Sequence, residues 1–304
     1  MAENNIENND QAPAAEQTER KGRRIRVGYL LLSFVPYAII TMIQAAAIIP
    51  GVILSLIDLT NSGLEYDFKS LMMIFNQKYA LVIYIVYSAA AIAVFLIWYY
   101  KGFVKRDPKV FYKKALGVKP LVLTLALIAC MFFIVTGAFS LVEILLPEVV
   151  NRYRELMEVT SLGSNMMITV IYGLILGPIV EELCFRGVAF RLLEKAGLHF
   201  VLAIVIQAAM FGIAHANLIQ GLYTFCMGLV FGYLRYKYRT LLISIAAHMF
   251  FNFTGTIVAT KLGEAGVTDN MYMIFGAICV VFAAGLFILI TKDKGVYSEQ
   301  EAAQ

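Results

Sequence analysis

The amino-acid sequence predicts an all-α, polytopic membrane protein with about eight transmembrane helices and both termini in the cytoplasm. Of its 304 residues, 60% are apolar and only 15% are charged, whereas a soluble domain has roughly 45–50% apolar and about 25% charged residues. A soluble protein could not bury so many apolar side chains, because its surface must be covered by polar groups. The same balance excludes a disordered chain, a coiled coil and a collagen-like repeat.

The apolar residues are grouped in stretches long enough to cross a bilayer, which requires about 20 predominantly apolar residues. Stretches without Asp, Glu, Lys or Arg cover residues 27–57, 79–100, 120–142, 159–180, 196–234, 240–260 and 270–291. The stretch 196–234 is too long for one helix, and a break at 216–221 divides it into two. Pro36 and Pro50 leave open whether 27–57 is one span or a span followed by an interfacial segment.

The distribution of lysine and arginine predicts the orientation, because these residues are enriched in cytoplasmic loops. With eight spans and a cytoplasmic N-terminus, 20 of the 25 basic residues lie inside. The five that remain outside are Lys69, Lys78, Arg152, Arg154 and Lys261. This asymmetry favours a multi-pass protein of the cell membrane with both ends in the cytoplasm.

Composition divides the chain into four parts. Residues 1–24 form a polar tail that we expect to be disordered, and residues 25–160 carry transmembrane helices 1–3. Residues 161–260 carry helices 4–7 and the polar groups described below. Residues 261–304 carry the last transmembrane helix and a cytoplasmic tail.

Two classes of partner or site are not expected. The net charge is only +4, and no compact basic domain with interleaved aromatic residues occurs, so nucleic acid is not an expected partner. The four cysteines, at positions 130, 184, 226 and 279, form no CxxC pair. We therefore interpret them as buried thiols rather than as a disulfide framework or a structural zinc site.

A pair of adjacent glutamates ends the fourth apolar stretch, at Glu181 and Glu182. Ionisable groups at membrane depth are costly and are therefore functional candidates. Arg186 follows Glu182 by four residues, so the two share a helix face and can form an ion pair. Glu181 points about 100° away on a helix and stays free for chemistry. The alternative interpretation is an ordinary salt bridge at a cytoplasmic helix end.

Two histidines lie within apolar helices farther along the chain. His215 follows Phe211 by four residues, and His248 precedes Asn252 by four, which places each pair on one helix face. Hydrogen bonding between membrane helices is the alternative role for such residues. His199, in the loop between helices four and five, has no polar helical partner and is set aside.

Helix lengths allow the depths of these groups to be compared. Helices four and five form a hairpin that turns near residues 196–198, and both Glu181 and His215 lie roughly 24–27 Å from that turn at 1.5 Å per residue. The two side chains are therefore expected at one level. His248 lies about ten residues, or roughly 15 Å, from its cytoplasmic loop and is expected at a shallower level, so helix tilting or an extended fourth helix is needed for all three groups to meet.

The chemistry of these groups fits hydrolysis. A carboxylate beside an imidazole can deprotonate a water molecule as a general base. A second imidazole and an amide can donate hydrogen bonds to a developing oxyanion. Glu181, His215 and His248 could instead ligate a divalent metal such as zinc, since two histidines and one glutamate form a known catalytic zinc set. The HExxH, P-loop and GxGxxG motifs are absent from the sequence.

The three motifs together resemble the type II CAAX prenyl endopeptidase and bacteriocin-immunity family of intramembrane proteases, also called Abi or CPBP. The family pattern is EExxxR, then FxxxH, then HxxxN or HxxxD, on successive membrane helices. Here it is Glu181 to Arg186, Phe211 to His215, and His248 to Asn252. The resemblance covers roughly residues 165–255, and the other helices match only in being hydrophobic.

The resemblance implies an eight-helix intramembrane endopeptidase that cuts peptides entering from the bilayer. It implies that Glu181 and His215 activate water, that His248 and Asn252 form the oxyanion site, and that Glu182, Arg186 and Phe211 support them. Family members are commonly labelled metalloproteases, yet a glutamate-activated water requires no metal, and we favour a site without a tightly bound zinc. Membrane lipid and a peptide substrate are the expected partners.

Two other classes remain open at this stage. A non-catalytic membrane protein could sequester a peptide such as a bacteriocin, although a binder does not need this set of side chains. A transporter could use membrane carboxylates as proton relays, although the chain lacks the paired repeats of many transporters.

Overall fold

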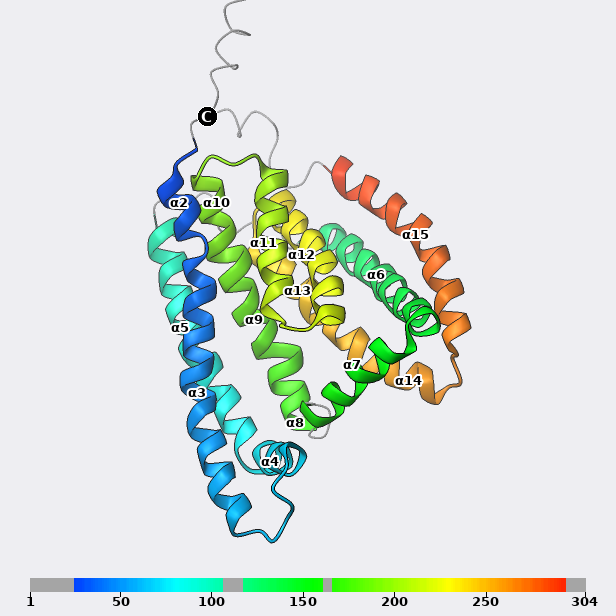
Figure 1. The fold of residues 1–304 in the computed structure, drawn as a ribbon. Coiled ribbons are helices and arrows are strands. Elements are labelled where there is room, and N and C mark those ends of the chain that lie inside the picture. The colour runs from blue at the N-terminus through cyan, green and yellow to red at the C-terminus, as the bar shows by residue number, and fades with distance from the viewer. Residues whose placement is uncertain (1–24, 106–116, 161–165, 294–304) are drawn as a thin grey trace, which may run out of the picture.

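The structure is a computed structural model that describes residues 25–105, 117–160 and 166–293. Every regular element in these ranges is a helix (Figure 1). The predicted disordered tail, residues 1–24, lies outside the described residues. The all-α prediction is confirmed.

The helices of the first half are α2 (Val27–Leu32), α3 (Val35–Thr60), α4 (Phe68–Ile74), α5 (Ala80–Tyr99), α6 (Val118–Leu145) and α7 (Pro147–Thr160). Those of the second half are α8 (Met166–Ile168), α9 (Gly177–Glu181), α10 (Phe190–Lys195), α11 (Phe200–Ala214), α12 (Leu218–Tyr238), α13 (Leu241–Phe253), α14 (Ala259–Glu264) and α15 (Asp269–Lys292). Five π-helical segments join them: η1 (Phe75–Tyr79), η2 (Tyr100–Val104), η5 (Thr169–Leu176), η6 (Glu182–Ala189) and η7 (Thr254–Val258).

Consecutive elements merge into continuous membrane spans, and the chain is a multi-pass membrane protein. Six helices in the described part of the chain are long and apolar enough to cross a bilayer. They are Val27–Thr60, Phe68–Val104, Val118–Leu145, Met166–Lys195, Leu241–Glu264 and Asp269–Lys292. The first of them is a single span that includes both prolines of the stretch 27–57. The predicted count of eight is therefore too high.

The two missing spans are α11 and α12, the halves of the stretch 196–234. Helix α11 has 15 residues and is only about 22 Å long, which is less than the roughly 30 Å of a hydrocarbon core. Helix α12 contains Gln220, Arg235 and Lys237, which lower its hydropathy. The turn between the two helices ends short of the level that α7 and α14 reach in Figure 1. The length of the apolar stretch 196–234 alone does not show that its two helices fail to cross the bilayer.

The α11–α12 hairpin is held together by close backbone contact. A Cβ atom on Gly212 would lie 2.7 Å from the carbonyl oxygen of Gly221, a distance that real Cβ atoms essentially never show. Glycine at position 212 therefore allows the two helices to touch at their turn. The turn itself uses Ala216 in the left-handed region, at φ 51°.

The helices surround this hairpin in two groups. Helices α3 and α5 run side by side along one flank, and α6 and α15 form a pair on the other, with α9 to α13 between them (Figure 1). Helix α15, from the predicted last part of the chain, packs along α6 from the first part. The boundaries predicted at residues 160 and 260 thus reflect sequence composition alone. Helices from different parts of the chain pack together across both boundaries.

Both ends of the described chain lie at the same end of the molecule, where α2 begins and α15 finishes (Figure 1). Basic side chains bind neighbouring segments there: Lys195 Nζ donates to the carbonyl of Gly102 at 3.1 Å, and Lys237 Nζ to that of Thr291 at 2.8 Å. An even number of spans keeps the two termini on one side of the membrane. The cytoplasmic orientation of that side remains a prediction.

Cysteine labelling tests this arrangement. In a background that lacks the four native cysteines, Ser62→Cys should react with a membrane-impermeant maleimide added from outside, because Ser62 follows the outer end of the first span. Asn217→Cys should not react, because the hairpin turn does not reach that surface. Equal labelling of the two positions would show that α11 and α12 both cross the bilayer, and the number of spans would then be eight.

Candidate active site

A cavity of about 700 Å³ lies between the two flanks, a volume that is typical of ligand and substrate sites. The side chains that line it include four of the predicted site residues: Glu181, His215, His248 and Asn252. Phe211, a predicted supporting residue, also lines it. Three motifs that are separated in sequence therefore meet in one cavity.

Pro178 determines the local structure on the N-terminal side of the glutamates. In the π-helical segment η5, the N–H of Gly177 donates to the carbonyl of Tyr172, five residues earlier. The next bond in this pattern would join residue 178 to Gly173, but proline has no N–H. The side chain of Asn252 donates to that free carbonyl instead, with Nδ2 at 2.9 Å from the oxygen. One proline thus creates the acceptor that orients Asn252.

The glutamate pair spans the junction of α9 and η6, and its two members have different environments. Glu182 is fully buried, whereas the side chain of Glu181 is 26% exposed. Glu182 Oε1 accepts a hydrogen bond from Arg186 Nη1 at 2.9 Å. The predicted ion pair is confirmed, and Glu181 is the glutamate that faces the cavity.

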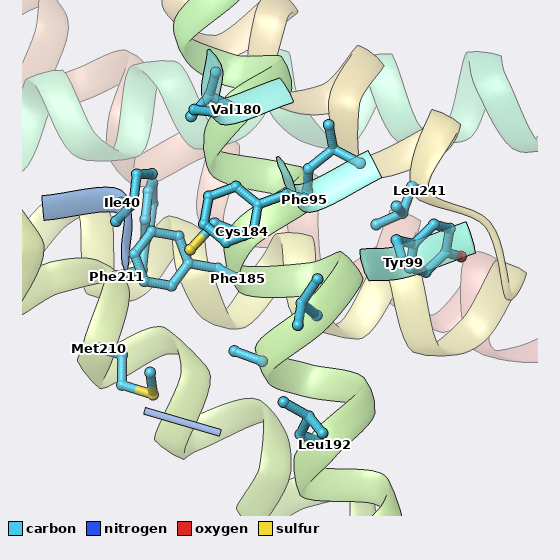
Figure 2. Close-up of a cluster of buried hydrophobic side chains, with 14 of the residues drawn as sticks. Ile40, Phe95, Tyr99, Val180, Cys184, Phe185, Leu192, Met210, Phe211 and Leu241 are labelled. Atoms are coloured by element: carbon cyan, nitrogen blue, oxygen red, sulfur yellow. The ribbon is translucent and has the colours of Figure 1, made fainter. Parts of the chain in front are cut away.

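Arg186 is also fully buried, and aromatic rings provide the rest of its environment. Its guanidinium carbon lies 4.3 Å from the ring centroid of Phe211 and 5.3 Å from that of Phe231. Phe211 packs edge-on against Phe185, at 5.3 Å between centroids, within the apolar cluster behind the site (Figure 2). Cation–π attraction and the ion pair offset part of the loss of hydration, since Nε and Nη2 of Arg186 have no hydrogen-bond partner among the described residues.

His248 joins the two glutamates, a contact that sequence reasoning missed. Its Nδ1 donates to Glu182 Oε1 at 3.0 Å, and its Nε2 lies 3.6 Å from Glu181 Oε2. The ring stacks on Phe231, at 4.9 Å between centroids. Glu182 and His248 are 66 positions apart in the sequence, and no periodic pattern over that distance could have indicated this bond.

The depth predicted for His248 was too shallow relative to Glu181. Segment η6 is a π-helix of eight residues between Glu181 and the end of the molecule where the described chain begins and finishes. A π-helix places more residues in each turn than an α-helix and so rises less per residue. The estimate from α-helical geometry therefore placed Glu181 too far from that end, and η6 accounts for part of the roughly 10 Å between the two predicted depths.

His215 is the C-cap of α11, at the turn of the hairpin. Its Nδ1 donates to the carbonyl of Phe211 at 2.9 Å. His248 and His215 thus both use Nδ1–H to bind a fixed acceptor, and in the neutral ring this leaves Nε2 as an acceptor. His199 lies elsewhere, where its Nδ1 accepts from the N–H of Val201 at 3.4 Å and caps α11.

The predicted metal candidates do not form a ligand set in this arrangement. Two imidazoles and a carboxylate are suitable donors for zinc. However, no three His, Cys, Asp or Glu side chains within residues 25–105, 117–160 and 166–293 are grouped closely enough to hold one ion. We therefore derive no chemical step that passes through a metal.

Removal of Arg186 tests the buried pair. Arg186→Ala should lower the free energy of unfolding by roughly 3–5 kcal/mol, because it leaves Glu182 buried with one cationic partner fewer. Lys261→Ala is the control, since it breaks an exposed pair with Glu264 and should cost about 0–1 kcal/mol. The measurement is thermal unfolding of the purified proteins, and equal melting temperatures for the parent and Arg186→Ala would contradict the pairing.

Comparison with known proteins matches the same region. Residues 163–254 match the family model described as Type II CAAX prenyl endopeptidase Rce1-like. A curated protein of Bacillus subtilis (strain 168), named "Putative membrane peptidase YdiL", is 37% identical over 84 residues, which are 27% of this chain and 34% of that protein. The match thus spans about a third of the relative's length, and no solved structure matches the chain. The resemblance indicated by the three motifs is confirmed over residues 163–254, which are similar to the Rce1-like type II CAAX prenyl endopeptidases.

Proposed function

We propose that this protein is a membrane endopeptidase that hydrolyses a peptide bond with a water molecule activated by Glu181. The observation that carries the proposal is the unequal environment of the two glutamates. Glu182 is fully buried and bound by Arg186 and His248, whereas Glu181 faces the cavity with a partly exposed side chain. A carboxylate held this way can accept a proton from water.

In the proposed reaction, Glu181 removes a proton from water while the hydroxyl oxygen bonds to the peptide carbonyl carbon. The carbonyl oxygen then becomes an oxyanion. Glu181 returns the proton to the amide nitrogen as the C–N bond breaks, which yields a free carboxylate and an amine. His215 Nε2 orients the attacking water as a hydrogen-bond acceptor.

The oxyanion requires donors. Asn252 has two amide N–H groups, one of which donates to Gly173, so the other is available. His248 Nε2 lies at the same cavity and is the second candidate donor when that nitrogen carries a hydrogen. These two donors come from one helix, α13, and line the same cavity. The substrate in this proposal is a peptide segment that enters from the bilayer.

The central test is Glu181→Gln, which keeps the size of the side chain but cannot accept a proton. Loss of a general base costs about 10²–10⁴-fold in rate, so cleavage of a fluorogenic membrane-peptide library by the purified variant should fall to background. Asn252→Ala should retain a small residual rate, since loss of an oxyanion donor costs about 10²–10³-fold. Circular dichroism and thermal unfolding should show that both variants are folded.

Two controls accompany this test. Glu264→Gln makes the same chemical change at an exposed glutamate outside the cavity, and His199→Ala removes a histidine that caps α11. Both should cleave at the parent rate. Unchanged cleavage by Glu181→Gln would refute the mechanism, and a parent that binds peptides without cleaving them would favour a peptide-sequestering immunity protein.

Metal dependence provides a separate test. Because the proposed steps need only Glu181, His215, His248 and Asn252, dialysis against EDTA and 1,10-phenanthroline should leave the cleavage rate unchanged. Metal analysis of the purified protein should give well below one zinc per chain. One zinc per chain that is lost in His215→Ala would replace this mechanism with a metal-dependent one.

A further inference from the structure

The cavity has a second wall formed by four tyrosines, which we call the tyrosine wall: Tyr37, Tyr84, Tyr87 and Tyr172. They come from α3, α5 and η5, and three of the four lie outside the region that matches the family model. The rings of Tyr84 and Tyr172 stack at 4.3 Å between centroids, with an interplanar angle of 13°. Tyr87 meets Tyr172 edge-on at 6.3 Å. These contacts give the wall a fixed shape.

Acidic and basic side chains are unequally represented in the lining of the cavity. Among the described residues that line it, Glu181 is the one carboxylate, and no lysine or arginine is present. Arg186, the nearest buried cation, lies behind Phe211 and is bound to Glu182. The remaining polar lining consists of the imidazoles of His215 and His248 and of hydroxyl and amide groups, such as that of Thr41. A substrate residue in this cavity therefore meets negative charge, aromatic rings and neutral hydrogen-bonding groups.

From this lining we infer that the tyrosine wall and Glu181 form a specificity subsite that favours a lysine or arginine of the substrate near the scissile bond and disfavours an acidic residue there. The inference rests on the proposed function and deepens it. Aromatic rings attract cations through their negative faces, and phenol oxygens accept hydrogen bonds from ammonium and guanidinium groups. Repulsion between Glu181 and an acidic substrate group about 8 Å away, at an effective dielectric constant of about 20, weakens the interaction of that substrate with the cavity roughly 30-fold.

This preference agrees with the composition of membrane substrates. Lysine and arginine are enriched in the cytoplasmic segments that flank membrane helices. A peptide that enters the cavity from the cytoplasmic edge of the bilayer would carry such residues beside its apolar segment. The proposed subsite would then favour a membrane peptide with a basic flanking segment over one with an acidic flanking segment.

The experiment uses the full-length protein and three membrane peptides that differ only at one position beside the cleaved bond, which carries Lys, Gln or Glu. We expect kcat/KM to decrease in that order, with the Glu peptide about 30-fold below the Gln peptide. Tyr84→Leu should reduce the preference for Lys over Gln by roughly 2- to 30-fold, the range of a cation–π contact. Tyr84→Phe retains the ring and should retain most of the preference.

Tyr66→Leu is the matched control, because Tyr66 is 71% exposed and lies outside the cavity. Equal kcat/KM for the Lys and Glu peptides, or an unchanged preference in a folded Tyr84→Leu protein, would overturn the subsite while leaving the peptidase intact. If the parent cleaves no peptide above the Glu181→Gln background, the proposed function fails and the subsite fails with it. The two failures are therefore distinguishable.

Discussion

The buried carboxylate of Glu182 is the constraint on which the rest of the site depends. A charge at this depth cannot be hydrated, so it must be neutralised by neighbouring groups. Arg186 provides one partner from the same helix, and His248 provides another from α13. Phe211 and Phe231 then cover the guanidinium. These contacts fix η6, α11, α12 and α13 relative to one another, because each contributes a group that the ion pair requires.

The position of Glu181 is a consequence of this arrangement. Glu182 is turned into the protein, so the preceding residue faces the cavity, where Nε2 of His248 lies 3.6 Å from its carboxylate. Removing the charge of Glu182 would therefore affect more than stability, since the ring of His248 would lose the acceptor that orients it. In the proposed mechanism, the supporting role of Glu182 and the chemical role of Glu181 are linked through the imidazole of His248.

Sequence reasoning identified the parts of the site that depend on local spacing. The four-residue separation of Glu182 and Arg186 predicted their contact because helix geometry is periodic. The bonds from His248 to Glu182 and from Asn252 to Gly173 were not predictable, because they join segments 66 and 79 residues apart. The tyrosine wall was missed for a related reason, since its tyrosines look like ordinary membrane-helix residues until α3 and α5 are packed against η5. The predicted number of spans was too high because the apolar stretch 196–234 was divided at 216–221 into two spans. Hydropathy does not show how deeply a helical hairpin inserts into the bilayer.

The pairing of α6 with α15 has a consequence for the order in which the protein is made. Helix α6 contributes Phe132, Val135 and Thr136 to the cavity, and close backbone contact fixes it to α15, where a Cβ on Gly276 would lie 2.8 Å from the carbonyl of Phe133. Helix α15 follows the helices that carry Glu181, His215 and His248 in the sequence, so it leaves the ribosome after them. While synthesis is in progress, one flank of the cavity therefore lacks its support, although the residues that surround Glu181 have already entered the membrane. The arrival of α15 is therefore the step that fixes α6 against the cavity in which Glu181 lies.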